Sequence, residues 1–220
     1  MPTPRPLPLF FACFILSLMF VSGFVKPAIA KTEITPLSTE DKETVRRVEQ
    51  YMNELGSMKS RFLQASSSGN YAEGTFYLSR PGKMRIEYDP PVKFLIVADG
   101  TWLIYHDKEI DQVTHIPLGM SPADLILEKN ISFSSGDIQV SKLERGPGIV
   151  AVTIIRDEGD DGHLTLIFKD KPLELKKWIV HDSQGVNTSV SLLSTRRDIR
   201  LDPKLFHVKM RPAKFKEPLK

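Results

Sequence analysis

Between residues 73 and 106, apolar and polar side chains alternate in the manner of successive β-strands. In residues 75–79 and again in residues 84–88, every second side chain is apolar. A period of two turns one face of a strand toward an apolar environment and the other toward water. Residues 94–98 are apolar throughout, which indicates a strand covered on both faces. The pattern therefore predicts a sheet with an apolar face, which covers either a core or a cavity.

Turn signals divide the chain at a spacing of about ten residues, which is typical of an antiparallel all-β fold. They include Arg80-Pro81-Gly82, Asp89-Pro90-Pro91, Asp99-Gly100, Gly146-Pro147-Gly148, Gln184-Gly185 and Arg196-Arg197-Asp198. A short run at residues 59–65, with Phe62 as its main apolar side chain, precedes the first stretch. Between the later turns we expect strands at residues 149–155, 163–169, 173–180 and 188–193.

One amphipathic helix is expected before the strands, from Ser38 to Gly56. Ser38 is a suitable N-cap, and acidic side chains follow it in the first turn, where the helix dipole favours them. Apolar side chains then recur at helical spacing, at Val45, Val48, Met52 and Leu55. Gly56 is expected to end the helix after about five turns. Such a stripe is typical of a helix packed on a sheet.

A second, unusually apolar helical segment interrupts the strands at residues 121–127. Ser121 stands at the expected cap and Pro122 at the first helical position. A short helix of this composition must bury most of its circumference. The apolar side chains in it and just before it are Leu118, Met120, Leu125, Ile126 and Leu127. A further helical turn is expected at residues 202–206, where Asp202 precedes a proline.

Residues 1–30 have the features of a secretory signal peptide. Arg5 is the only charged side chain before an apolar run from Leu7 to Val25, and Ala28-Ile29-Ala30 fits the cleavage pattern of small residues. The alternative is a transmembrane anchor, since the run approaches the length needed to span a bilayer. Because the cleavage pattern favours a signal peptide, we expect an exported, periplasmic protein. Its mature part, residues 31–220, is expected to be a single domain.

Charge and cysteine content narrow the class of partner. Removing Arg5 and Lys26 from the 30 Lys and Arg residues leaves 28 against 27 Asp and Glu, so the mature chain is nearly neutral. That balance gives no indication of nucleic-acid binding. The single cysteine, Cys13, lies inside the apolar run of the signal peptide. The mature part is therefore expected to have no disulfide and no cysteine for lipid attachment.

No sequence motif indicates catalysis, a metal or a cofactor. The five histidines form no HExxH pattern, and the chain has no GxSxG elbow and no Walker loop. Gly146-Pro147-Gly148 begins a GxGxxA pattern, but a β-branched strand follows it instead of a helix, which indicates a turn. We therefore expect a protein that is not an enzyme and has no cofactor. An enzyme on this fold is an alternative, because sites and not folds determine chemistry.

The order of these elements resembles the LolA family, the periplasmic carriers of outer-membrane lipoproteins. One similar feature is Arg80-Pro81 at the end of a strand. Another is the hairpin of residues 95–105, in which Asp99-Gly100 separates an apolar strand from an aromatic-rich one. The capped helix from Ser38, the Phe62-Leu63-Gln64 run and the apolar helix of residues 121–127 match as well.

The resemblance implies a mainly β fold with helices, in which an incomplete, strongly curved antiparallel β-barrel is covered by an α-helical lid. An apolar cavity between sheet and lid would take up the acyl chains of a lipoprotein. The candidate cavity residues are Phe62, Phe76, Leu78, Met84, Ile86, Phe94, Ile96, Trp102, Ile104, Leu118, Met120, Leu125 and Ile126. Ordinary core packing is the alternative role for each of them.

Arg80 would be the latch of this lid. In the family, an Arg in the Arg-Pro context donates hydrogen bonds to main-chain carbonyl groups of the lid and holds the ligand-free form closed. A guanidinium has the five donors that such a role needs. The alternative is a solvated Arg at the end of a strand, as most Arg side chains are exposed.

The family also implies partners. The cargo would be outer-membrane lipoproteins, received from an inner-membrane ABC transporter of the LolCDE type and passed to a LolB-type receptor, with the carrier acting as a monomer. The alternatives are a periplasmic regulator of the RseB type, which senses lipid or lipoprotein, and another lipid-binding protein on the same fold. The sequence departs from the family after Val208, where its end is short and basic.

Overall fold

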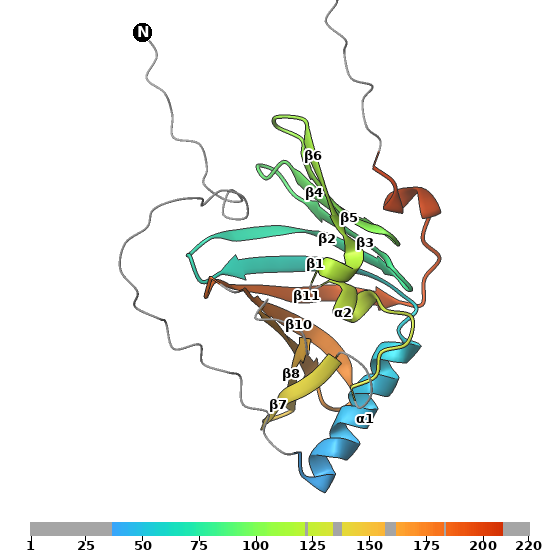
Figure 1. Cartoon of the computed structure of the whole chain (residues 1–220), viewed down its shortest axis with the longest axis vertical. Helices are drawn as coiled ribbons and strands as arrows, with labels where there is room; N and C mark the ends of the chain where they lie inside the picture. The colour runs from blue at the N-terminus through green and yellow to red at the C-terminus, as the bar shows by residue number, and fades with distance from the viewer. Residues whose placement is uncertain (1–36, 122, 134–137, 157–161, 183, 209–220) are drawn as a thin grey trace, which may run out of the picture. The chain divides into compact units, whose positions relative to one another are not determined.

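Within the described residues, eleven β-strands form a single antiparallel sheet in the computed structural model (Figure 1). The structure describes residues 37–121, 123–133, 138–156, 162–182 and 184–208. The predicted signal peptide of residues 1–30 and the basic end after Val208 lie outside these residues. No helix in the described part of the chain is long and apolar enough to span a bilayer.

The strands follow one another across the sheet in an order that leaves two edges. From one edge to the other they are β6 (Gln112–Pro117), β5 (Trp102–Asp107), β4 (Phe94–Asp99), β3 (Lys83–Tyr88), β2 (Tyr71–Ser79), β1 (Ser57–Ser66), β11 (Asn187–Arg197), β10 (Glu174–His181), β9 (His163–Lys169), β8 (Ile149–Arg156) and β7 (Ile138–Gly146). Because β6 and β7 lie at opposite edges, the sheet is open. The predicted antiparallel, incompletely closed β fold is thus confirmed.

In the part of the chain that the structure describes, two α-helices and two 3-10 helices accompany the sheet. They are α1 (Thr39–Glu54), η2 (Leu118–Met120), α2 (Asp124–Leu127) and η3 (Pro203–Phe206). The predicted cap of α1 is confirmed, because Ser38 accepts from the N–H of Asp41 while the Asp41 carboxylate accepts from the N–H of Ser38. Asp202 caps η3 in the same way through the N–H of Lys204.

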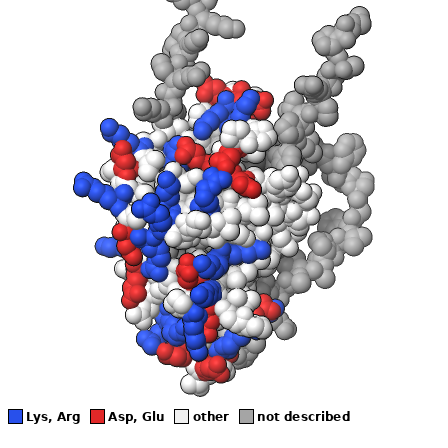
Figure 2. All heavy atoms as spheres, turned by 180° about the vertical axis from the view of Figure 1, so that it is seen from behind, with Lys and Arg blue, Asp and Glu red and all other residues white. Residues whose placement is uncertain are grey.

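The two faces of the sheet have different neighbours. We call inner the face whose side chains join the large hydrophobic core together with α1, η2 and α2, and outer the opposite face. On the outer face, Leu95 and Val97 pack with Phe206 of η3. Elsewhere on that face, Arg85 pairs with Glu87. The view from behind Figure 1 shows basic and acidic side chains interspersed (Figure 2).

Two sequence expectations are wrong in detail. Ser121 does not cap α2, since the cap position is Ala123 and the buried Ser121 hydroxyl has no hydrogen-bond partner among the described residues. The expected turn at residues 196–198 starts too early, since β11 continues to Arg197 and the chain turns at Asp198, where φ is 53°. The expected turn at Gly146-Pro147-Gly148 is confirmed, because it joins β7 to β8.

Candidate functional site

Most of the predicted cavity residues lie together on the inner face. Ile86 packs there while half-buried. Phe94 is half-buried and shares its face with Ile96 by alternation along β4. The members that are fully buried in the large core are Phe62, Phe76, Leu78, Met84, Ile96, Leu118, Leu125 and Ile126.

Three predicted cavity residues are placed elsewhere. Ile104 of β5 stands opposite Val97 of β4, whose side chain belongs to the outer cluster, so Ile104 lies on the outer face. Trp102 is on the same face as Ile104, 40% exposed, with its ring edge against His115. Met120, at the end of η2, is 79% exposed.

The inner face also includes aromatic and apolar side chains that sequence reasoning did not select. In β5 the inner positions belong to Leu103 and Tyr105. Trp178 of β10 packs against Phe76 with ring centroids 5.1 Å apart, which joins the two halves of the sheet across β1 and β11. The sequence around Trp178 did not reveal its burial, because a register shift between Leu175 and Lys177 breaks the alternation and because its partner Phe76 is distant in sequence.

Arg80 contacts the segment that contains α2. Its Nε and Nη2 atoms both donate to the carbonyl oxygen of Glu128, the residue that follows α2, with 3.2 Å from Nε. The third nitrogen, Nη1, is buried and has no hydrogen-bond partner among the described residues. Burial lowers the pKa of Arg80 below its ordinary value, while the charge of Glu128 acts in the opposite direction. The arrangement fits the expected contact, but a latch role stays a prediction.

The turn between β2 and β3 makes a second contact with the same segment. The N–H of Gly82 donates to the carbonyl of Leu127 over 2.9 Å. A Cβ atom at Gly82 would lie 2.9 Å from the Cα of Gly100, and its φ of +76° also favours glycine. The β2–β3 and β4–β5 turns therefore pack closely, and together they position the donors that face the last carbonyl groups of α2.

Hydrogen bonds join both ends of segment 118–133 to the sheet or to α1. At its start, the N–H of Leu118 donates to the carbonyl of Thr101 over 3.0 Å. At its end, the Asn53 side chain of α1 accepts from the N–H of Ile131 and donates to its carbonyl. The Glu49 carboxylate accepts from the N–H of Phe133 over 2.8 Å. We call residues 118–128 the lid segment, since it lies between these ties and contains η2 and α2.

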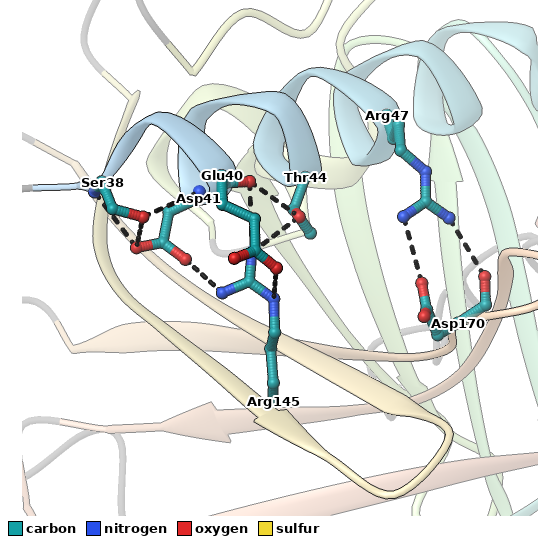
Figure 3. A network of polar contacts seen from close by, with 7 residues as sticks. All are labelled: Ser38, Glu40, Asp41, Thr44, Arg47, Arg145 and Asp170. Carbon is teal, nitrogen blue, oxygen red and sulfur yellow. Dashed lines mark hydrogen bonds and ion pairs between the residues drawn. The ribbon is translucent and has the colours of Figure 1, made fainter.

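Helix α1, in contrast, is fixed to the sheet by an extended polar network (Figure 3). Arg145 of β7 pairs with Asp41 and donates to the hydroxyl of Thr44. Arg47 donates to the carboxylate and to the carbonyl of Asp170, each over 3.1 Å. These contacts join the first half of α1 to β7 and to the residue that follows β9.

No group of three or more His, Cys, Asp or Glu side chains that could hold a metal ion occurs within the described ranges. The chemistry that the inner face offers is therefore apolar contact with a few main-chain and side-chain donors at its border. An arrangement of this kind suits a lipid better than a charged ligand.

A family model and curated relatives show which family the chain is similar to. The model of the family described as "Outer membrane lipoprotein carrier protein LolA" matches residues 53–209. An outer-membrane lipoprotein carrier protein of Alkalilimnicola ehrlichii is 29% identical over 189 residues, which cover 79% of this chain and 83% of that protein. One from Methylobacillus flagellatus is 27% identical over 163 residues, 70% of this chain and 78% of that protein. The crystal structure of a LolA superfamily protein from Nitrosomonas europaea is similar at 9% identity, with a TM-score of 0.43 and coverage of 74% and 97%.

Proposed function

The chain belongs to the LolA family of outer-membrane lipoprotein carrier proteins, and we propose that it is a periplasmic chaperone that carries lipoproteins from the inner to the outer membrane. The lipoprotein's acyl chains would lie against the inner face of the sheet, beneath the lid segment. The partners would be a LolCDE-type transporter, which loads the carrier, and a LolB-type receptor, which unloads it. No chemical step is needed for this function, since cargo is only buried and released.

One observation carries the proposal: the apolar inner face of the sheet is covered by a segment whose own apolar side chains are buried against it. Leu118, Leu125 and Ile126 of that segment are buried against the sheet. Its hydrogen bonds to the sheet described above come from Arg80, Gly82 and Leu118. Displacing the segment costs about 1 kcal/mol net for each hydrogen bond that breaks, and it also exposes the segment's apolar side chains. Acyl chains that replace the segment would restore that burial.

The energetics of the cargo require such a protein. Exposing an acyl chain to water costs about 0.8 kcal/mol for each methylene group, so a lipoprotein with several chains cannot cross an aqueous space alone. Apolar burial is non-directional, which allows chains of different length to bind and to leave again. A flexible side chain such as Met84 suits a surface that must repack around variable cargo.

The test is loading from membranes. The protein is incubated with ATP and inner-membrane vesicles that contain the transporter and an acylated lipoprotein, and the supernatant is analysed by size-exclusion chromatography. We expect a soluble one-to-one complex with the acylated lipoprotein and none with its unacylated form. If folded protein yields no such complex, the carrier function is wrong.

A matched pair of variants locates the binding face. Ile86→Lys adds a charge to the half-buried inner face, whereas Leu193→Lys adds the same charge to the outer face, where Leu193 is 50% exposed. We expect the first variant to lose the complex and the second to keep it. Circular dichroism and thermal melting of both variants separate loss of binding from loss of folding.

A further inference from the structure

A tyrosine on β3 reaches across β2 to a glutamine on β1. The hydroxyl of Tyr88 donates to Oε1 of Gln64 over 2.8 Å. In the register of the sheet, Gly74 of β2 stands between Tyr88 and Phe62, and Ala72 of β2 stands opposite Gln64. The hydrogen bond therefore joins β3 to β1 across β2, where the two residues beneath it, Ala72 and Gly74, are small.

Gly74 is the reason that the ring of Tyr88 can take this position. A Cβ atom there would lie 2.7 Å from a ring carbon of Phe62, closer than real contacts allow. Without that atom, Phe62 and Tyr88 meet edge to face over the glycine, with ring centroids 5.4 Å apart. The packing fixes the direction of the phenol and aims its hydroxyl at Gln64.

The pair has donor capacity that the described part of the chain does not use. The single O–H of Tyr88 donates to Oε1 of Gln64. The Nε2 atom of Gln64 carries two N–H groups, and no hydrogen bond joins it to another described residue. Both side chains are half-buried, and Gln64 Nε2 is not one of the described side-chain atoms that are buried without a partner. Water can therefore reach this donor, and a carbonyl oxygen of a ligand could replace that water as the acceptor.

The surroundings of the pair are apolar and inner. Ile86 and Tyr105 pack beside it against the large core, and Val190 stands opposite Gln64 on β11. Burial raises the pKa of the Tyr88 phenol above its ordinary value, so the hydroxyl stays protonated and remains a donor. In binding sites that are mostly apolar, a small number of polar groups usually determines the position and orientation of the ligand.

We propose that Gln64 and Tyr88 form a polar subsite that binds a carbonyl oxygen of the cargo lipid, in an ester or an amide linkage. Gln64 contacts the carbonyl through Nε2, and Tyr88 is a positioning residue that holds the Gln64 amide in the donating orientation. Apolar contacts alone let an acyl chain slide along the inner face, whereas a hydrogen bond at its polar end sets its depth. The subsite rests on the proposed function, because it presupposes that acyl chains lie on this face.

The experiment uses three lipids with the same C16 chain length that differ at the linkage. They are 1-palmitoylglycerol with an ester carbonyl, N-palmitoylethanolamine with an amide carbonyl, and 1-O-hexadecylglycerol, an ether without a carbonyl. Each is titrated into the wild-type protein and into Gln64→Leu by displacement of a fluorescent fatty-acid probe. We expect Gln64→Leu to bind the ester, the amide or both about five- to tenfold more weakly and the ether unchanged. If only one of the two carbonyl lipids binds more weakly to Gln64→Leu, that lipid contains the linkage that the subsite recognises.

Isotope-edited infrared spectroscopy gives an independent readout. A ¹³C-labelled carbonyl of the lipid should absorb at the lower frequency of a hydrogen-bonded group in the wild-type protein and at the higher frequency of a free group in Gln64→Leu. Tyr88→Phe keeps the ring on Phe62 and removes only the hydroxyl, so it serves if Gln64→Leu fails to fold. It should weaken carbonyl binding to a smaller extent. Gln112→Leu, on the exposed edge strand β6, is the control and should change nothing.

The outcomes separate the subsite from the proposed function. If the wild-type protein binds the three lipids and Gln64→Leu and Tyr88→Phe change the affinities for ester, amide and ether equally, or not at all, the subsite is overturned and the carrier function is left intact. Failure of the wild-type protein to bind any of the three lipids overturns both.

Discussion

Arg80 and Glu128 are joined by two hydrogen bonds, both from one guanidinium to one main-chain carbonyl oxygen. Glu128 lies directly after α2, where the last carbonyl groups of the helix need donors. Since the N–H of Gly82 serves Leu127 in the same way, the β2–β3 turn caps the end of α2 from outside the helix. A contact between two segments 48 residues apart thus joins the end of α2 to the β2–β3 turn.

Replacing Arg80 by leucine should weaken the closed state without unfolding the sheet. The backbone N–H of Arg80 bonds to the carbonyl of Gly56 and is unaffected by the change. Hydrogen bonds to a charged group contribute about 1.5–3 kcal/mol, so the lid equilibrium should shift roughly tenfold to hundredfold toward the open form. We expect Arg80→Leu to accept lipoprotein but to transfer it poorly to the receptor. Arg80→Lys, with a charge but no fork of donors, should be intermediate, and unimpaired transfer by Arg80→Leu would refute the latch.

Local features of the fold could be predicted from sequence, and long-range ones could not. The Ser38 cap and the Asp99-Gly100 turn involve neighbouring residues only, and both occur as expected. Strand β1 was expected as a short run, but it pairs with both β2 and β11. Its inner position Ser60 is only 1% exposed and bonds to the carbonyl of Leu193. A buried serine breaks the apolar alternation, and its partner is 133 residues away.

The faces of β4 and β5 show why the candidate site was predicted only in part. Residues 94–98 are apolar on both faces, so their sequence does not indicate which side chains of β4, or of the neighbouring strand β5, point to the inner face. Register alone decides that Leu103 is inner, opposite Ala98, and that Ile104 is outer, opposite Val97. A shift of one residue exchanges the two faces. The predictions for Trp102 and Ile104 were therefore wrong, although both side chains are apolar enough for a cavity.

Removing the hydroxyl of Tyr51 should destabilise the protein. That hydroxyl accepts from the buried N–H of Leu175 over 3.1 Å, which ties α1 to β10. Tyr51→Phe keeps the edge contact with Phe168 but leaves the N–H without a partner, at a cost of about 1–3 kcal/mol in the free energy of unfolding. Urea denaturation measures the change. Tyr71→Phe, at a site 79% exposed, is the control and should stay within about 0.5 kcal/mol of wild type.

Adding one methyl group at Gly74 should also destabilise the fold. The new Cβ atom would collide with the ring of Phe62 and with the carbonyl of Glu87 in the adjacent strand. Because a backbone carbonyl cannot move aside easily, we expect Gly74→Ala to cost about 1–3 kcal/mol and to displace the ring of Tyr88. Gly56→Ala is the matched control, since nothing lies within 4 Å of its Cβ position. Equal stability of the two variants in urea denaturation would contradict this account of Gly74.

The end of α1 near Asp41 gives the fold a dependence on pH. The side-chain hydrogen bond from Ser38, followed by that from Arg145, lowers the pKa of Asp41 below its ordinary value (Figure 3). In the unfolded chain the carboxyl has its ordinary pKa of about 3.9, so it binds a proton at a higher pH there than in the folded state. Stability from this group is therefore fully present above about pH 5 and is lost as the pH falls through the folded-state pKa.

The Asp41→Asn variant should reveal this dependence as a difference in melting temperature that changes with pH. At pH 6 the wild-type protein should melt at a higher temperature than Asp41→Asn, because only the carboxylate is charged against Arg145. As the pH falls from 5 to 3, the Asp41 carboxyl of the unfolded chain binds a proton before that of the folded protein does, so the two melting temperatures should approach each other. In an Arg145→Gln background the difference at pH 6 should shrink but not vanish, because the main-chain N–H and the hydroxyl of Ser38 still donate to the Asp41 carboxylate. A difference that stays constant from pH 6 to pH 3 would mean that the charge of Asp41 does not stabilise the fold.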